Sequence, residues 1–156
     1  GLNNATLSEN TAFGLTLLSN DPFLGDPGIM VPNNAQKLAL DYSFFTSGSD
    51  NFELRVLDSS GGADYFSYFH DGTLFAPGAY TGAFELDLSA LGWVSGPIGL
   101  EFSLVSNFND STFDASLDIS NVMFLNNTTT PLPSPSGSIL LLLGSLWIAA
   151  RHNRES

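Results

Sequence analysis

Cysteine is absent from this chain, and basic residues are scarce. Without cysteine the protein has no disulfide, no thiolate metal site and no cysteine nucleophile. Only 4 of the 156 residues are lysine or arginine, against 16 aspartate or glutamate, so the formal net charge is −12. Nucleic acid is therefore not an expected partner, because contacts with phosphates need basic side chains. The same deficit argues against docking of the acidic part onto an anionic membrane surface.

The first 125 residues also lack an amphipathic helical stretch of useful length. Apolar and polar residues alternate instead, with the period of half-buried strands. In 12–18 this pattern places Phe13, Leu15 and Leu17 on one face. Turns rich in Gly, Pro, Asn and Asp separate the runs, and the segment 21–34, with three prolines, is expected to be an irregular loop. The predicted fold is an all-β antiparallel sandwich with strands at 12–18, 37–45, 51–57, 64–70, 83–89, 98–105 and 115–124.

The character of the sequence changes after this domain, which we place at 1–125. Residues 126–136 form a linker rich in Pro, Thr and Ser, whose prolines favour an extended chain. An apolar segment at 137–150 and a short polar tail at 151–156 follow. We therefore predict one C-terminal transmembrane helix.

The apolar segment is short for a membrane span. Its fourteen residues would make a helix of about 21 Å, against a hydrocarbon core of about 30 Å, and a buried core helix is the alternative. The segment is apolar all round, an interfacial Trp147 lies near its charged end, and Arg151 and Arg154 follow at once. The positive-inside rule puts these arginines in the cytoplasm. The predicted anchor residues are Leu140, Leu141, Leu142, Leu143, Leu146, Trp147, Ile148, Arg151 and Arg154.

The C-terminal arrangement resembles a known sorting signal. Pro133, Ser134, Pro135 and Ser136, then the Leu-rich run, then the basic cluster, are similar to the PEP-CTERM signal of exported Gram-negative proteins, which exosortases process. The stretches 38–62, 81–107 and 113–124 resemble jelly-roll sandwiches of the carbohydrate-binding and lectin kind. The resemblance implies a bacterial inner-membrane protein with one span, a jelly-roll-like domain on the periplasmic side and a cytoplasmic C-terminus.

Candidate catalytic groups are few. The two histidines are His70 and His152; His70 precedes Asp71 in a turn, and we expect it to face water at a strand end. No G-x-S-x-G nucleophile elbow is present. A pair of carboxylates could serve a glycosidase, but outward strand positions favour a solvated acidic face. The carboxylates concerned are Glu53, Glu85, Asp87, Glu101 and Asp118. We expect no enzyme, and no cofactor beyond a structural calcium ion.

Oxygen-rich turns are the candidate calcium sites, since calcium takes six to eight oxygen ligands. The resemblance implies such an ion, although Asx turns explain the same residues without a metal. The candidate ligands are Asp58, Asp64, Asn109, Asp110 and Asp114.

Aromatic side chains are the candidate binding groups. Exposed rings flanked by polar groups would suit a sugar, and exposed apolar rings would equally suit a protein interface; burial in the core is the third reading. The candidate rings are Tyr65, Tyr68, Phe69, Tyr80 and Trp93.

Two functions follow as hypotheses. The favoured one is a non-catalytic accessory subunit of a larger membrane protein complex, for example a respiratory or photosynthetic one, with other subunits and the lipid bilayer as partners. The alternative is a surface or matrix protein that binds polysaccharide and is sorted by the PEP-CTERM system.

Overall fold

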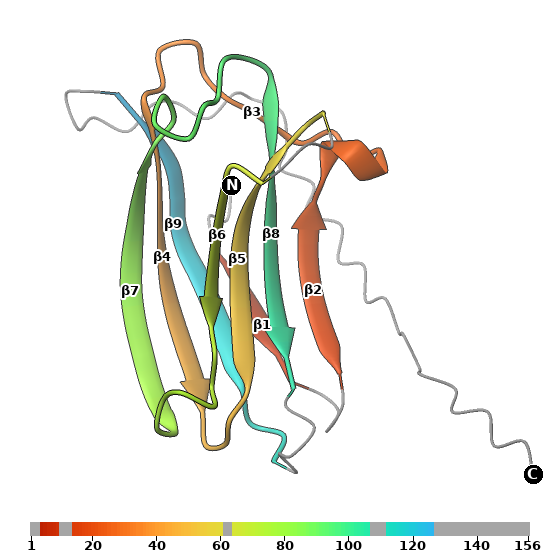
Figure 1. The fold of residues 1–156 in the computed structure, drawn as a ribbon, viewed down its shortest axis with the longest axis vertical. Helices are drawn as coiled ribbons and strands as arrows, with labels where there is room; N and C mark the ends of the chain where they lie inside the picture. Colours follow the sequence, from red (N-terminus) through yellow and green to blue (C-terminus); the bar gives the residue numbers. More distant parts are fainter. Residues whose placement is uncertain (1–3, 10–13, 61–63, 107–111, 127–156) are drawn as a thin grey trace, which may run out of the picture.

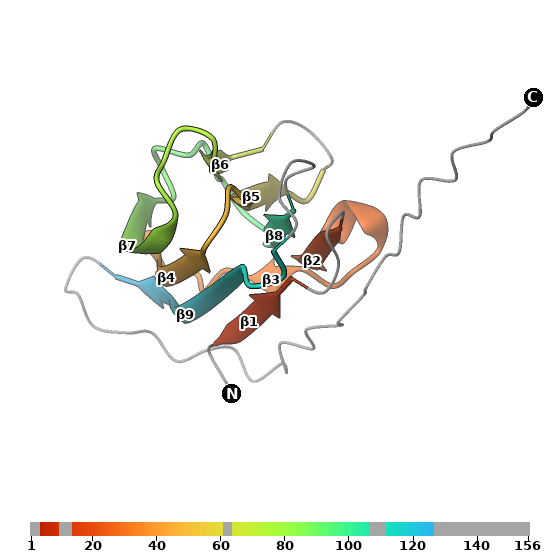
Figure 2. The ribbon, with the colours of Figure 1, turned by 90° about the horizontal axis from the view of Figure 1, so that it is seen from below.

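The computed structural model describes residues 4–9, 14–60, 64–106 and 112–126. These residues form a sandwich of two antiparallel sheets (Figures 1 and 2). One sheet has the order β1-β9-β4-β7, and the other has the order β2-β8-β5-β6, with β3 added on β8. The predicted all-β antiparallel sandwich is confirmed. The strands are β1 Ala5–Ser8, β2 Leu15–Asn20, β3 Ile29–Met30, β4 Lys37–Thr46, β5 Asn51–Asp58, β6 Phe66–His70, β7 Gly78–Asp87, β8 Pro97–Val105 and β9 Ser116–Leu125.

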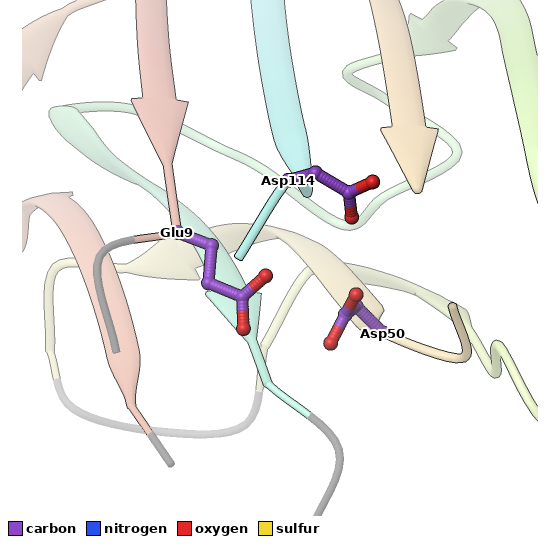
Figure 3. A group of neighbouring side chains, drawn as sticks. All are labelled: Glu9, Asp50 and Asp114. Atoms are coloured by element: carbon purple, nitrogen blue, oxygen red, sulfur yellow. The ribbon is translucent and has the colours of Figure 1, made fainter. Parts of the chain in front are cut away.

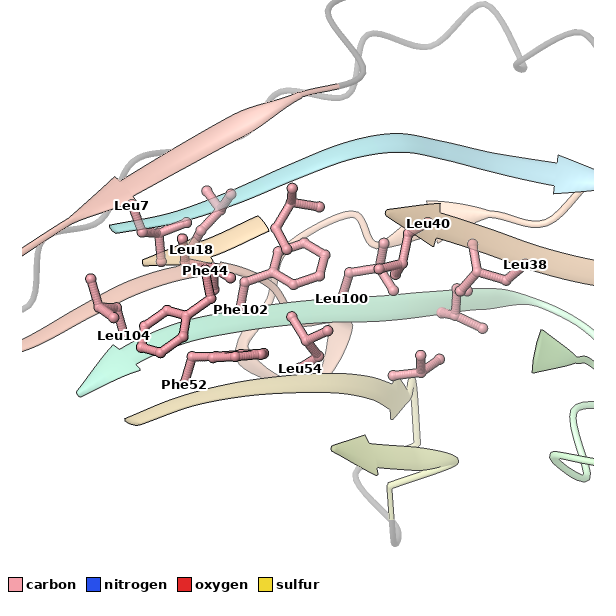
Figure 4. Packing of buried hydrophobic residues seen from close by; sticks show 14 of the residues in the cluster. Leu7, Leu18, Leu38, Leu40, Phe44, Phe52, Leu54, Leu100, Phe102 and Leu104 are labelled. Carbon is pink, nitrogen blue, oxygen red and sulfur yellow. The ribbon is translucent and has the colours of Figure 1, made fainter. Parts of the chain in front are cut away.

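Alternating apolar residues of both sheets meet in one core (Figure 4). Phe44 of β4 and Phe52 of β5 are fully buried, with ring centroids 4.7 Å apart. The inward residues of β8 are buried as the alternation predicts, and so are Leu117 and Ile119 of β9. Burying such side chains contributes about 1.5–3 kcal/mol each, so these positions hold the two sheets together.

In the N-terminal strand, predicted at 12–18, the buried face is not the one that the apolar alternation indicated. In β2 the buried leucine is Leu18, whereas Leu15 is 44% exposed. Leu17 and Leu18 are adjacent, so the sequence allowed either parity. The hydrogen-bonded register with β8, which pairs Leu18 with Phe102, fixes the choice.

The proline-rich segment 21–34 is more ordered than predicted. It contains the short 3-10 helix η1, Pro22–Leu24, which the Asp21 side chain caps by accepting from Phe23 N at 2.9 Å. Strand β3 follows and pairs with the start of β8. Both features were missed because two or three residues carry no periodic pattern.

Strand β9 contains a bulge opposite β4. Asp41 pairs with Ser120 and Ala39 with Met123, so two residues of β9 oppose one of β4. Asn121 sits in the bulge with φ of 52° and donates its amide to Asp41 Oδ2 at 2.6 Å. Asn tolerates this left-handed conformation better than most residues, which explains its place here.

One end of the sandwich carries the features discussed below, and we call it the acidic end. There β1, β4, β6 and β8 finish, and β5, β7 and β9 begin. Its segments are Glu9, the turn 47–50, the loop 71–77 and residues 112–115; it lies at the bottom of Figure 1. Loop 88–96, between β7 and β8, lies at the opposite end.

Candidate metal centre and exposed surfaces

Three carboxylates from distant parts of the sequence meet at the acidic end (Figure 3). Glu9 follows β1, Asp50 precedes β5 and Asp114 precedes β9. The two ladders of β9 bring them together, because Ser8 of β1 and Phe45 of β4 both pair with Ser116. One oxygen of each carboxylate lies within 4.8 Å of the other two.

Hydrogen bonds fix these carboxylates in place. The fully buried Asp50 accepts from Thr46 Oγ1 at 2.8 Å, and Thr46 Oγ1 accepts from Gly48 N at 2.9 Å. Glu9 Oε2 accepts from Ala115 N at 3.3 Å, while Glu9 N donates to Ala115 O at 2.9 Å. The arrangement is thus built into the turn 47–50 and the β1–β9 ladder rather than carried on a free surface.

Two observations favour a hard cation at this cluster. Glu9 Oε1 is buried and has no hydrogen-bond partner among the described residues. Lys37 and Arg55, the two lysine or arginine residues in the described ranges, pair with carboxylates elsewhere. Three clustered carboxylates repel one another unless a cation or protons compensate them. Oxygen ligands of this kind suit calcium, with carbonyls and waters completing its shell.

The predicted calcium ligands do not all lie at one place in the structure. Asp114 belongs to the cluster, together with Glu9 and Asp50, which were not among the residues predicted from the sequence. Asp58 and Asp64 do not join it: Asp58 is the last residue of β5, at the opposite end of that strand, and Asp64 lies in the segment between β5 and β6. Asn109 and Asp110 lie outside the described residues.

The carboxylates of Asp58 and Asp64 accept hydrogen bonds from nearby residues. Asp58 accepts from Ser60 N at 3.1 Å and from the Tyr65 hydroxyl at 3.2 Å. The side-chain and backbone hydrogen bonds from Ser60 lower the pKa of Asp58. Asp64 makes a two-pronged contact with Arg55, at 2.9 Å to both Nε and Nη2. These are a turn and an ion pair, which need no metal.

The carboxylates considered for a glycosidase lie on two different faces. Glu53 and Glu101 stand on the outer face of the β2-β8-β5-β6 sheet, beside Arg55, with Glu101 Oε1 at 2.7 Å from Arg55 Nη1 and Glu53 Oε1 at 4.0 Å from Nε. The remaining three belong to the other sheet: Glu85, Asp87 and Asp118. Arg55 compensates Glu53 and Glu101 on the first of these sheets, and Lys37 pairs with Glu85 on the second.

The predicted binding rings are mostly directed inward. Phe69 of β6 is 53% exposed on the outer face. The others are partly buried and pack against the core: Tyr65, Tyr68, Tyr80 and Trp93. Trp93 Nε1 donates to Gly96 O at 3.3 Å. These rings therefore do not form a shared exposed platform.

Exposed apolar side chains also gather around the acidic end. Phe45 is the penultimate residue of β4, Phe113 precedes Asp114, and Leu74 and Phe75 belong to loop 71–77. Their exposed fractions are 43%, 59%, 76% and 48%. Sequence alternation could not find them, because three of the four lie in loops.

The predicted anchor 137–150 and the sorting motif 133–136 lie outside the described residues. Within the described ranges, no helix has the length and apolarity needed to cross a membrane.

Comparison with known proteins finds weak structural similarity to solved folds. No family model and no curated protein matches the chain. A solved structure described as "CBM4 structure and function" aligns over 83% of this chain and 71% of its own, with TM-score 0.43 and 8% identity. The infectious bursal disease virus VP2 subviral particle aligns over 76% of this chain and 32% of its own, with TM-score 0.37 and 12% identity. Likenesses of this strength carry no argument about function.

Proposed function

We propose that this chain is a non-catalytic binding domain that contacts other protein subunits of a bacterial membrane complex through its acidic end. The observation that carries the proposal is the grouping of Phe45, Leu74, Phe75 and Phe113 there, each more than two-fifths exposed. Burying apolar rings at the centre of an interface supplies most of its binding energy. With so few basic residues, the chain recognises partners by apolar contact rather than by positive charge.

The proposal includes the C-terminal anchor and a calcium ion. The anchor at 137–150 holds a jelly-roll-like domain on the periplasmic side of the inner membrane, where the effective concentration of membrane subunits is high. A calcium ion held by Glu9, Asp50 and Asp114 stiffens the segments that carry Phe45 and Phe113. Stiffening before binding lowers the entropy lost on association.

Native gel sizing of detergent-solubilised membranes tests this function. Wild-type protein should migrate in an assembly larger than its own monomer. A Leu74→Ser/Phe113→Ser variant should dissociate from it, because truncating apolar anchors costs more than about 1 kcal/mol at an interface centre. Val94→Ser is the matched control, since Val94 is 85% exposed but lies at the opposite end. Monomeric wild type, or equal loss with Val94→Ser, would contradict the proposal.

Polysaccharide binding is the second candidate, and one observation favours it. The exposed ring of Phe69 lies beside Glu53 in the β5–β6 register, and Ser67 Oγ donates to Glu53 Oε1 at 3.1 Å. An apolar ring next to oriented polar groups is a suitable sugar contact. A glycan array that gives no signal with wild type, or the same signal with Phe69→Ala, would remove this candidate.

A further inference from the structure

His70 is buried, contrary to the prediction that it faces water. It ends β6, it is 2% exposed, and its Nε2 atom has no hydrogen-bond partner among the described residues. A buried imidazole nitrogen without a partner is costly, and a buried imidazolium costs more. The residue therefore needs a physical account.

Aromatic rings from four segments enclose the imidazole. Its ring centroid lies 5.1 Å from those of Phe44 in β4 and Phe52 in β5, and 4.8 Å from that of Tyr80 in β7. The nearest ring is Phe75, stacked at 4.4 Å with an interplanar angle of 21°. Phe75 belongs to loop 71–77 and is half exposed, so this loop forms the outer wall of the enclosure.

The titratable groups near His70 already make hydrogen bonds with other residues. Asp71 favours the imidazolium, but its Oδ1 accepts from Thr73 N at 2.9 Å and from Thr73 Oγ1 at 2.6 Å. The Tyr80 hydroxyl donates to Ala76 O. Asp50, in the neighbouring turn, accepts from Thr46.

Strands β4 and β5 present uncharged phenylalanine rings. Burial is the larger effect and lowers the pKa of His70, against the smaller opposing effect of Asp71. The neutral imidazole is thus the form that the closed enclosure accommodates.

We propose that His70 and Phe75 form a latch that holds loop 71–77 closed at neutral pH and releases it in acid. Neutral His70 stacks on Phe75 and keeps the loop against the sandwich. Protonation requires solvation of the imidazolium, which is achieved by moving Phe75 and its loop outward. Because the open state titrates near the ordinary value of about 6.5, closure is fully favoured above that pH and is lost as pH falls below it.

Hydrogen exchange on the full chain in detergent tests the latch. Between pH 7.5 and pH 5.5, exchange of the loop 71–77 amides, corrected for intrinsic rates, should rise by about tenfold, the change that a group titrating near 6.5 in the open state permits. Core amides of β4 should not change in parallel. In a His152→Gln background, NMR should give His70 a pKa below 6.5. A value at or above 6.5 overturns the proposal.

A variant separates His70 from the carboxylates of this end. His70→Phe retains the aromatic packing and removes the titration, so the acid-induced rise in loop exchange should disappear. His152→Gln retains His70 and should keep the rise. An unchanged rise in His70→Phe overturns the latch. If that variant does not fold, the NMR pKa and the pH dependence of exchange in the His152→Gln protein decide the question.

Discussion

The phenol ring of Tyr42 occupies the space that a side chain at Gly82 would need. The two residues pair across β4 and β7, and a Cβ at residue 82 would lie 2.5 Å from Tyr42 Cε1 and 2.7 Å from its hydroxyl oxygen. The ring consequently reaches across β7 to Phe84, with centroids 5.6 Å apart, and toward Tyr68, at 6.0 Å. Glycine here is a packing requirement of an edge strand.

Gly82→Ala should therefore destabilise the domain by about 1–3 kcal/mol, the usual cost of overpacking. Gly78→Ala on the same strand is the matched control: its Cβ would meet nothing within 4 Å, so its effect should stay within about 0.5 kcal/mol. Urea unfolding measures both. A Tyr42→Ala background should relieve most of the Gly82→Ala penalty, and equal penalties in both backgrounds would contradict the proposed clash.

Tyr42 should ionise well above the ordinary range of a tyrosine. Burial, followed by its hydrogen bond with Tyr68, raises the pKa of Tyr42 to about 12. In the unfolded chain the value is about 10, so the folded state retains the proton longer and stability should fall as pH rises from about 10 toward 12. Alkaline titration of tyrosinate absorbance should lose a step near pH 12 in Tyr42→Phe, whereas Tyr65→Phe should retain that step.

The anchor prediction has a direct test. Leu143→Arg places a charge in the middle of the predicted span, at a cost of about 2.5–3.5 kcal/mol on insertion scales. The variant should move from the membrane fraction to the soluble fraction after carbonate washing. Leu15→Arg, an exposed position of β2, is the control that should stay membrane-bound. Unchanged partitioning of Leu143→Arg would favour a core helix instead.

The strands were predictable where alternation was unambiguous. In β5 and β8 every second residue is a large apolar one, and period-2 patterning then specifies both the strand and its buried face. In β2 two adjacent leucines left the facing open, and only pairing with β8 resolves it. The short strands β1 and β3 carry too few residues for any period and depend on the sheets that they join.

The acidic cluster was only partly predictable, because its members are brought together by strand pairing. Asp114 stood out in an oxygen-rich stretch, but Glu9 lies more than a hundred residues earlier, and only the β1–β9 ladder brings it close. The burial of His70 was not predicted either. Its neighbours in sequence indicated a surface turn, whereas aromatic rings from four separate segments bury it. In both cases the decisive partners are distant in sequence.

Calcium should raise the stability of the domain, and Asp114 should be needed for this effect. Sites in extracellular modules bind calcium with Kd of about 10⁻⁴–10⁻³ M. At about 10 mM calcium, such a site stabilises by about 1.4–2.7 kcal/mol, equivalent to several degrees in Tm for a domain of this size. Magnesium should give less, because it demands a stricter octahedral shell.

Differential scanning fluorimetry after chelation, with and without calcium, measures this shift in wild type and two variants. Asp114→Asn should lose most of the calcium increment. Without calcium it should be at least as stable as wild type, because one of three mutually repelling charges is gone. Asp58→Asn, at the far end of β5, removes the same charge and should keep the full increment. A wild-type Tm unaffected by calcium, or an Asp114→Asn variant that retains the increment, would show that Glu9, Asp50 and Asp114 are not the ligands of a calcium ion.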